Sequence, residues 1–440
     1  MEMSDLPEGW EYAPIGALCN LVNGRAFKPQ EWSSSGLPII RIQNLNNPEA
    51  KFNFFSGELE SKHHVRAGDL LFAWSGTPGT SFGAHIWNRG DAALNQHIFK
   101  IEFSDSDIDR DFLRYAINQK LDELIGSAQG GVGLRHVTKG TFEKTEIAFP
   151  PLTEQVRIAA KLGELLAQVD TLKARVDGIP VLLKHVRQSI LASAVSGRLT
   201  EEWRGKNADF NVTTLGKVCA VSTGKTPKRG QADYWEGGNI PWLTSALTGT
   251  EFCSEAEQFV TVRALKECTL KLYQPGTLLM AMYGEGKTRG QVTELKIEAT
   301  CNQACAAISV NETLANKDFV KIRLQENYEE VRKMAVGGAQ PNLNLEKVRE
   351  ISICLPSMEE QAEIVRRVGQ LFAFTDQLEA LISVARARIE RLPQSILAKA
   401  FRGELVPQEP NDEPASALLE RIKAQRAAAT KPKRGRKALA

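Results

Sequence analysis

Hydrophobic residues recur with one shared period in two stretches of the chain, Leu152–Leu199 and Met358–Leu405, where the steps alternate between four and three residues. The repeating positions are Ile158, Leu162, Leu165, Val169, Leu172, Val176, Ile179, Leu183, Val186 and Ile190 in the first stretch, and Ile364, Val368, Leu371, Thr375, Leu378, Ile382, Ala385, Ile389, Leu392 and Ile396 in the second. A period of 3.5 residues held over several heptads is typical of a coiled-coil seam. We therefore expect two long helices that pack antiparallel and bury each other's seams.

The two stretches are also copies of each other. The matching segments, at a constant offset of 206 residues and without a gap, include Glu154-Gln155 with Glu360-Gln361, Gly163 with Gly369, Asp170 with Asp376, and Gln188–Ala192 with Gln394–Ala398. Loops tolerate drift in length, so a repeat that keeps its register indicates that the spacing itself has a function.

Local signals predict where these helices begin and end. Pro150-Pro151 and Pro356 end the preceding extended segments, and Ser357–Glu360 fits a capping box. Gly197 and Gly403 follow the last apolar turns, where a left-handed residue closes a helix. Each helix should then have roughly 40 residues and a length of about 60 Å.

The first copy alone contains the sequence Gly178-Ile-Pro180. Proline removes one backbone donor and crowds the preceding turn, so we expect a kink at this point.

A segment of about 150 residues precedes each helix; we call them block 1 (1–151) and block 2 (205–356). The blocks resemble each other with gaps: Asn23-Gly24 matches Thr223-Gly224, and Asn95-Gln96 matches Asn302-Gln303. Short apolar runs bounded by Gly, Pro and Asn predict strands at Leu37–Ile42, Asp69–Trp74, Ile98–Phe103 and Glu146–Phe149, and helical periodicity covers Asp109–Leu124 and Lys317–Met334. The expected fold class is α+β: two globular mixed α/β domains separated by two long helices that form an antiparallel coiled coil, with internal pseudo-two-fold symmetry.

The domain organisation follows from this division. The expected segments are 1–151 as the first globular domain, 152–204 as the central helix, 205–356 as the second globular domain, 357–405 as the C-terminal helix, and 406–440 as a basic tail that is partly disordered.

Composition narrows the class of protein. The chain of 440 residues is 42% hydrophobic, without an apolar run of membrane-spanning length or a secretory signal sequence. Seven cysteines, without a Cys-x-x-Cys pair, favour unbridged thiols and a cytoplasmic location. Cys301 and Cys305 could reach one metal ion, but buried apolar cysteines are the better interpretation, since no histidine or second pair completes a ligand set. No metal site is therefore expected.

No complete catalytic motif is found in the sequence. Ser222–Thr226 and Tyr283–Thr288 imitate a phosphate-binding loop, but Cys219 and Ala281 stand where its first glycine is required. The Asn/Asp-Pro-Pro-aromatic motif of DNA methyltransferases is not found, and no nucleophile elbow of a hydrolase precedes a helix. The chain is expected to be non-catalytic.

Charge is unevenly distributed. The formal net charge is +2, but Arg421–Ala440 holds eight Lys or Arg and no acidic residue. The remainder is slightly acidic, so contacts with nucleic acid must come from local patches. A helix over Ala415–Ala429 should lead into the basic tail, which either solubilises the chain or binds phosphate.

Several loops of the two blocks combine basic, amide and aromatic residues that suit contacts with base edges and phosphates. Any one of them is more often a solvated surface residue, but their concentration in diverged loops favours DNA binding. The candidates are Arg25, Lys28, Arg41, Gln43, Asn44, Trp74 and Ser75 in block 1, and Lys225, Lys228, Arg229, Thr244, Ser245, Tyr283, Lys287 and Arg289 in block 2.

The helix motifs resemble those of one known family. The repeated Glu-Gln-x-x-Ile start and the Gln-Ser-Ile-Leu-Ala-x-Ala-x-x-Gly-x-Leu end look like those of the specificity subunit of type I restriction-modification enzymes. So does the order of block, helix, block, helix and basic tail. The similarity covers nearly the whole chain and is strongest over Glu154–Trp203 and Glu359–Leu405.

The resemblance implies a function. Each block would be a target recognition domain that reads one half of a bipartite, asymmetric site on double-stranded DNA. The helices would set the spacer and dock two methyltransferase subunits, which methylate adenine and bind S-adenosylmethionine. Motor and nuclease subunits, with ATP and Mg²⁺, would add restriction. No cofactor is then expected in this chain.

Three alternatives remain open. The first is a single-chain enzyme, and the second is a non-catalytic coiled-coil scaffold whose two globular domains bind protein partners. The third is a helix pair that forms between two chains instead of within one.

Overall fold

The computed structural model describes residues 6–47, 49–76, 82–126, 135–204, 210–284, 288–331 and 343–429. The chain divides into two compact units. Unit 1 comprises Met1–Arg175 with Ala385–Ala440, and unit 2 comprises Val176–Val384. Each unit therefore contains one globular block together with one segment from each long helix.

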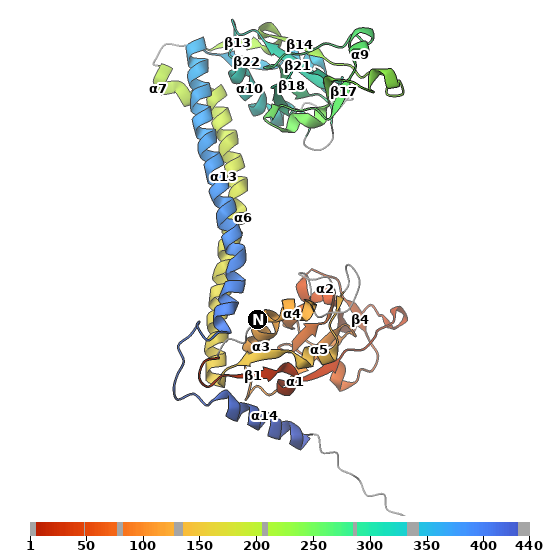
Figure 1. The fold of residues 1–440 in the computed structure, drawn as a ribbon, viewed down its shortest axis with the longest axis vertical. Coiled ribbons are helices and arrows are strands. Elements are labelled where there is room, and N and C mark those ends of the chain that lie inside the picture. The colour runs from red at the N-terminus through yellow and green to blue at the C-terminus, as the bar shows by residue number, and fades with distance from the viewer. Residues whose placement is uncertain are drawn as a thin grey trace, which may run out of the picture. The chain divides into compact units, whose positions relative to one another are not determined.

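The two repeated stretches of the sequence form two long helices (Figure 1). Helix α6 spans Leu152–Val195 and helix α13 spans Met358–Ala400, with 44 and 43 residues. These lengths agree with the roughly 40 residues expected. Pro180 lies inside α6, so Gly178-Ile-Pro180 does not end the helix. The kink at that point stays a prediction.

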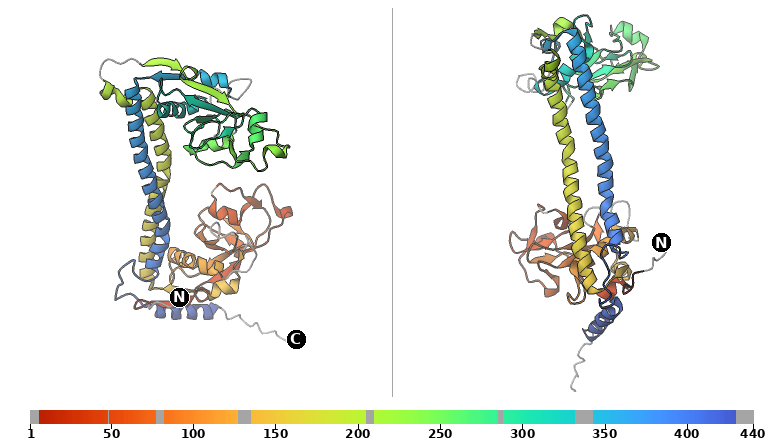
Figure 2. Two further views of the ribbon diagram at one scale, coloured as in Figure 1. Left: turned by 45° about the horizontal axis from the view of Figure 1, so that its top comes forward. Right: turned by 90° about the vertical axis from the view of Figure 1, so that its left-hand side faces the viewer.

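The helix segments pack side by side within each unit (Figure 2). In unit 1 the start of α6 meets the end of α13, because Ile158 and Leu162 share a core with Ile396 and Ala400. In unit 2 the end of α6 meets the start of α13, where Leu191, Ala194, Ile364 and Val368 share another core. The two helices therefore run antiparallel in both units, as the repeat predicts.

The predicted helix ends are confirmed at their glycines. Gly197 has φ 73° and Gly403 has φ 72°, both in the left-handed region. The capping box of α13 forms only in part. The Ser357 hydroxyl accepts a hydrogen bond from the Glu360 N–H at 3.3 Å, but the Glu360 carboxylate binds Thr200 and Arg204.

Block 1 is built on a four-stranded sheet in the order β2-β10-β6-β8, with a second sheet in the order β4-β3-β9-β5 and the pairs β1-β12 and β11-β7. Its strands are β1 (Glu11–Pro14), β2 (Asn20–Asn23), β3 (Leu37–Ile40), β4 (Asn53–Phe55), β5 (His64–Val65), β6 (Leu70–Ala73), β7 (Ser75–Gly76), β8 (Gly83–Ile86), β9 (Ala92–Leu94), β10 (Ile98–Glu102), β11 (Arg135–His136) and β12 (Glu146–Phe149). Its helices are α1 (Ile15–Leu18), α2 (Ile42–Asn46), α3 (Arg110–Gln119), α4 (Leu121–Gly126) and α5 (Lys139–Lys144).

Block 2 repeats this plan with sheets in the orders β14-β21-β18-β19-β16 and β17-β15-β20 and the pair β13-β22. Its strands are β13 (Asn211–Thr214), β14 (Cys219–Thr223), β15 (Ile240–Leu243), β16 (Phe252–Cys253), β17 (Gln258–Val260), β18 (Leu278–Ala281), β19 (Val292–Leu295), β20 (Thr300–Cys301), β21 (Cys305–Val310) and β22 (Ser352–Leu355). Its helices are α8 (Leu215–Val218), α9 (Val262–Glu267), α10 (Lys317–Glu326) and α12 (Leu345–Arg349), and α7 (Glu201–Arg204) precedes the block.

Three predicted elements have different bounds in the structure. The run Leu37–Ile42 yields a strand only to Ile40, because Asn44 caps the short helix α2 that follows. The helical stretch at Asp109–Leu124 divides into α3 and α4 at Lys120. Helix α10 ends at Glu326, and the rest of the stretch predicted to Met334 lies partly outside the described residues.

The predicted helix near the C-terminus is confirmed as α14 (Ala415–Ala429). It packs on block 1 in unit 1, where Leu418 and Ile422 join the core. Arg421 pairs with the buried Asp107 at 2.9 Å. The basic segment after this helix lies outside the described residues. No helix of the described ranges is long and apolar enough to cross a membrane.

Candidate nucleic-acid interface

A buried glutamine fixes block 1 to α6. The Gln155 amide nitrogen donates to the carbonyl oxygen of Pro150 at 2.9 Å, and its amide oxygen accepts from the Asp109 N–H at 3.0 Å. Asp109 is the N-cap of α3, which packs on the sheet of block 1. The side chain of Gln155 has no exposed surface. It therefore joins the first turn of α6 to the first turn of a helix inside the block.

Block 2 has the same junction at the start of α13. The Gln361 amide donates to the Pro356 carbonyl at 2.9 Å and accepts from the Asn316 N–H at 2.7 Å. Asn316 is the N-cap of α10, the counterpart of Asp109 in α3. Since both junctions use the same atoms, the repeated glutamine has a defined role: it fixes each block to its helix.

The glutamate before each glutamine is also buried, but its partners differ. Glu154 accepts a hydrogen bond from the Trp10 indole at 2.9 Å, and burial raises the pKa of its carboxyl. Glu360 accepts from Thr200 at 2.7 Å and from Arg204 at 2.9 Å. This second pair connects the residues that follow α6 to the start of α13 within unit 2. The Glu-Gln motif is thus a structural junction in both copies.

The first group of candidate residues in block 1 surrounds a short turn. The Arg25 guanidinium pairs with Glu31 and lies 4.8 and 4.9 Å from the ring centres of Phe27 and Phe55. The Lys28 side chain is exposed beside it, while its backbone N–H donates to Glu31 at 2.8 Å. Lys28 is therefore placed for an outside contact, and the Arg25 charge is balanced within the block.

The second group begins directly after β3. The Arg41 guanidinium donates to Gln43 at 3.1 Å and lies 5.9 Å from the Trp32 ring, and Gln43 is exposed. Asn44 is fully buried, where it caps α2 and donates to the Ala50 carbonyl at 3.1 Å. The geometry gives Asn44 a role in holding this turn, while Arg41 and Gln43 reach the surface.

Block 2 has a similar arrangement at the corresponding loop. Arg229 lies 4.1 Å from the Trp235 ring centre and 4.7 Å from that of Trp242, and it donates to Gln258 at 2.7 Å. The exposed Lys225 donates to Thr269 at 2.6 Å. Lys228 is exposed as well, and its carbonyl accepts from the Trp235 indole at 3.1 Å.

The remaining candidates of block 2 lie at the ends of β15 and β18. Thr244 precedes a 3₁₀ turn, and the Ser245 carbonyl in that turn accepts from Thr248 at 2.7 Å. Tyr283 packs against the core of block 2. Arg289 donates to the Gly284 carbonyl at 3.4 Å. Lys287 lies outside the described residues.

Trp74 and Ser75 follow β6, and the structure adds two histidines beside them. The His97 and His136 rings lie 5.4 and 5.8 Å from the Trp74 ring, which stacks on Phe99 at 5.7 Å. Ser75 is buried and pairs with His136 across β7 and β11. Sequence reasoning missed both histidines as site residues, because they are separated from Trp74 by long stretches of chain.

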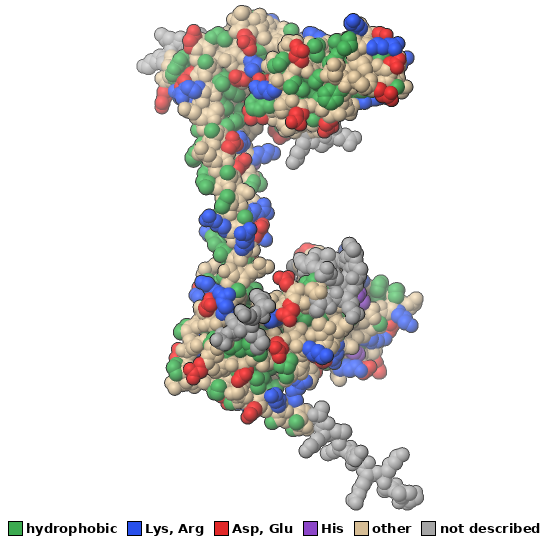
Figure 3. Space-filling model, in the orientation of Figure 1, with side chains coloured by type: hydrophobic (Ala, Val, Ile, Leu, Met, Phe, Trp, Pro, Cys, Tyr) green, Lys and Arg blue, Asp and Glu red, His purple; other side chains and the backbone are tan. Residues whose placement is uncertain are grey.

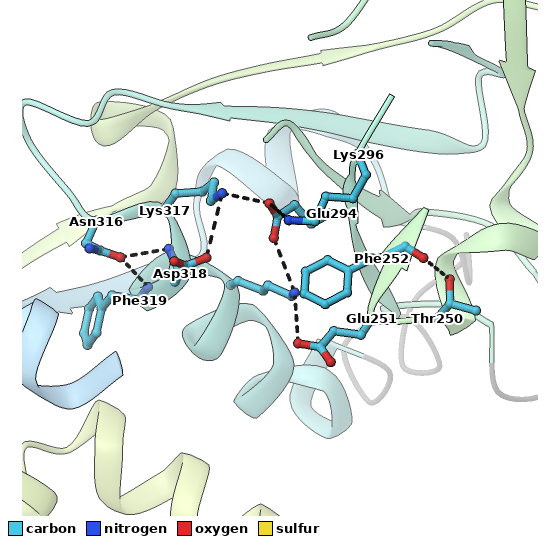
Figure 4. Close-up of polar contacts among 10 residues, drawn as sticks. Thr250, Glu251, Phe252, Glu294, Lys296, Asn316, Lys317, Asp318 and Phe319 are labelled. Atoms are coloured by element: carbon cyan, nitrogen blue, oxygen red, sulfur yellow. Dashed lines mark hydrogen bonds and ion pairs between the residues drawn. The ribbon is translucent and has the colours of Figure 1, made fainter. Parts of the chain in front are cut away.

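The sequence also did not predict a cluster of charged residues around Glu294. Glu294 is buried in β19, and Figure 4 shows Lys296 and Lys317 directed at its carboxylate. Lys317 lies at 2.8 Å, Lys296 at 2.9 Å and Lys321 at 3.5 Å from its carboxylate oxygens. Burial favours a higher pKa for Glu294, but hydrogen bonds from Lys317 and Lys296 outweigh it and hold the pKa below its usual range. Glu251 and Asp318 also pair with Lys321 and Lys317, so three carboxylates balance the three lysines, and the cluster joins α10 to the sheet.

Basic and acidic side chains are interspersed on the face drawn in Figure 3. The helix pair of unit 2 also exposes large apolar side chains. They include Val181, Leu182, Val186, Phe374, Leu381 and Val384, with exposed fractions of 46 to 66%. Val186 was expected in the buried seam, so that expectation is wrong at this position. Such a surface on a water-facing helix pair is typical of a site that binds another protein.

Within the described ranges no three His, Cys, Asp or Glu side chains group as metal ligands. Cys301 and Cys305 are fully buried free thiols, as the sequence predicts. A hydrogen bond with the neighbouring Cys301 thiol, together with burial, raises the pKa of Cys305. Both side chains belong to the apolar core of block 2.

Known proteins match this chain over nearly its full length. A family model described as type I restriction modification DNA specificity domain matches residues 7–180 and 207–384. The chain is 32% identical to the EcoBI specificity subunit of Escherichia coli over 98% of its length and 95% of the relative. It is 29% identical to the StySPI specificity subunit of Salmonella potsdam over 99% and 100%.

Solved structures share the fold. The HsdS subunit from Thermoanaerobacter tengcongensis superposes with a TM-score of 0.63 at 20% identity, covering 92% of this chain and 99% of that one. A chain from a structural study of the assembly of a type I R-M system gives 0.69 at 20% identity, covering 91% and 100%.

Proposed function

Because this chain belongs to the family of type I restriction-modification DNA specificity subunits, we propose that it selects the DNA sequence on which a restriction-modification complex acts. Block 1 and block 2 are the target recognition domains, each reading one half of a bipartite, asymmetric site. The domains are 1–151 and 205–356, the helix regions are 152–204 and 357–405, and the tail is 406–440. The chain itself is non-catalytic and acts in the cytoplasm.

One observation carries this proposal: the junctions are the same in both copies and the loops are not. Gln155 and Gln361 make equivalent buried hydrogen bonds in the two units. The candidate loops carry different side chains on corresponding strands. A protein that reads two unlike half-sites at one fixed spacing needs this combination, because half-site spacing follows from protein geometry.

The helix pair is the proposed ruler and docking element. Its exposed apolar residues in unit 2 supply a surface for a methyltransferase subunit, and the duplication provides for two such subunits. Those subunits bind S-adenosylmethionine and methylate adenine. Motor and nuclease subunits, with ATP and Mg²⁺, restrict unmodified DNA.

The candidates that reach the surface contribute contacts with DNA. In block 1 these are Lys28, Gln43 and the partly exposed Arg41, and in block 2 they are Lys225, Lys228 and Arg229. Arginine and glutamine can each form paired hydrogen bonds with a base edge, while lysine suits phosphates.

A binding selection from a random DNA pool tests the proposal. The full chain with its partner subunits should enrich one bipartite motif with a fixed spacer, and binding should weaken steeply with salt. Binding without sequence enrichment or salt dependence would favour a scaffold for protein partners. Methyltransferase activity of the isolated chain would instead indicate an enzyme.

A second arm tests the ruler. Four residues inserted near Asp170 add about 6 Å of helix, which corresponds to roughly two base pairs. The preferred spacer should change, whereas the same insertion after Glu409, in an exposed loop, should leave it unchanged. An unchanged spacer with the first variant contradicts the ruler.

A further inference from the structure

The backbone at the end of the central strand is the same in both blocks. In block 1 the Trp74 N–H donates to the His97 carbonyl at 3.4 Å, and the Trp74 carbonyl accepts from the Val137 N–H at 3.0 Å. In block 2 the Met282 N–H donates to the Ala304 carbonyl at 2.7 Å, and the Met282 carbonyl accepts from the Leu343 N–H at 3.2 Å. Strand pairing agrees, since β6 pairs with β10 as β18 pairs with β21.

The side chains at these equivalent positions differ in chemistry. Met282 and Leu343 are both 2% exposed and belong to the core of block 2. Trp74 and His97 are only partly buried, and so is His136, the residue before Val137. The contrast lies at two positions, because Trp74 and His97 in block 1 stand where block 2 has Met282 and Ala304. Val137 and Leu343 are both buried and apolar, and the counterpart of His136 lies outside the described residues.

Three ring nitrogens of this group have no hydrogen-bond partner within the part of the chain that the structure describes. They are Trp74 Nε1, His97 Nδ1 and His136 Nδ1, and all three atoms are buried. Buried polar atoms are paired in the great majority of cases, so three unpaired nitrogens around one tryptophan indicate that a partner is supplied by a ligand.

The chemistry of these nitrogens restricts that ligand. The indole nitrogen can only donate, and a neutral imidazole has one donor and one acceptor. Burial and the nearby His136 lower the pKa of His97, which disfavours the charged form of that ring. The Trp74 indole therefore requires an acceptor atom on the ligand, and each imidazole nitrogen pairs with a donor or an acceptor according to its tautomer.

We propose that Trp74, His97 and His136 form a base-reading group of block 1, in which the Trp74 indole donates to an acceptor atom and the two imidazole nitrogens pair with polar atoms on base edges of one half-site. This inference rests on the proposed function. Suitable acceptors are N7 and O6 of guanine, N7 of adenine and O4 of thymine in the major groove. Side-chain rotations on binding, which are common at interfaces, bring the nitrogens to the base edge. Block 2, with Met282 and Ala304 instead, reads its half-site with other residues.

Two variants test the group in the full chain expressed with its partner subunits. Trp74→Phe removes the indole N–H and keeps a ring to stack on Phe99, and His97→Ala introduces the residue that block 2 has at this position. Discrimination at one or two base pairs of one half-site should fall about tenfold, equivalent to about 1.4 kcal/mol. The other half-site and the spacer should stay the same.

Trp87→Phe is the matched control. Trp87 is a buried tryptophan in block 1 whose indole donates to the Gly90 carbonyl at 2.6 Å, and it packs in a separate part of the core. This variant should lower stability without changing either half-site. Unchanged discrimination in both test variants would overturn the inference.

The salt dependence separates base contacts from phosphate contacts. Loss of affinity that is uniform across all sequences, with a shallower salt dependence, would assign the group to phosphates and also overturn the base-reading role. If the wild-type chain with its partners yields no bipartite motif at all, the proposed function fails, and this inference fails with it.

Discussion

Replacing Gln361 by leucine should destabilise the junction between α13 and block 2. The side chain is 1% exposed, and its amide joins the Pro356 carbonyl to the Asn316 N–H at 2.9 and 2.7 Å. Leucine has a similar volume but cannot form either hydrogen bond. Each of the two buried groups left without a partner costs about 1 to 3 kcal/mol, so the expected loss is roughly 2 to 6 kcal/mol. Urea unfolding of the full chain measures it.

Gln370→Leu is the control for this substitution. Gln370 lies on the same helix but is exposed, where it accepts from Arg366 at 3.0 Å. Its replacement should change stability by less than about 0.5 kcal/mol. Hydrogen exchange locates the effect, because amides in the first turn of α10 should lose protection only in the Gln361 variant. A Gln361→Leu protein as stable as the control, with unchanged protection, would refute the junction role.

Three further predictions follow from individual contacts. Gly403→Ala should lower stability by about 1 kcal/mol or more in thermal unfolding, because φ is +72° and the added methyl group would collide with Pro7. Glu294→Gln should cost about 3 kcal/mol, because the buried Lys321 and the partly buried Lys317 lose the buried carboxylate that they share. Because the pKa of Glu294 is lowered in the folded chain, its contribution to stability is present above the ordinary carboxyl pKa of about 4.3 and is lost as the pH falls through the lower folded value. A free energy of unfolding, measured in urea, that does not fall over this acidic range would contradict this. If the apolar surface of the helix pair docks a methyltransferase subunit as proposed, Leu182→Lys should abolish capture of that subunit, and the unfolding midpoint should stay the same because Leu182 is 61% exposed.

Local features of this fold could be predicted from the sequence. The left-handed glycines Gly197 and Gly403 and the lengths of both long helices depend on neighbouring residues, and the structure confirms them. The second half of the capping box failed, because Arg204, 156 residues away, binds the Glu360 carboxylate. Local signals cannot reveal a competitor at that distance.

The candidate site was harder to predict, because its members meet only after folding. The role of Gln155 depends on Asp109, which is 46 residues away, and His97 and His136 gather around Trp74 only through strand pairing. Asn44 has a residue type that suits adenine, but its position after β3 makes it a buried cap. Residue type indicated the loops, whereas burial and partners decided the individual residues.

Mapping methylated adenine in the genome of cells that express this chain with its partner subunits shows directly whether the two blocks read a split DNA site. We expect one bipartite, asymmetric motif with two unlike half-sites and a single spacer length. Modification without a motif, or a motif with one continuous site and no spacer, would contradict it.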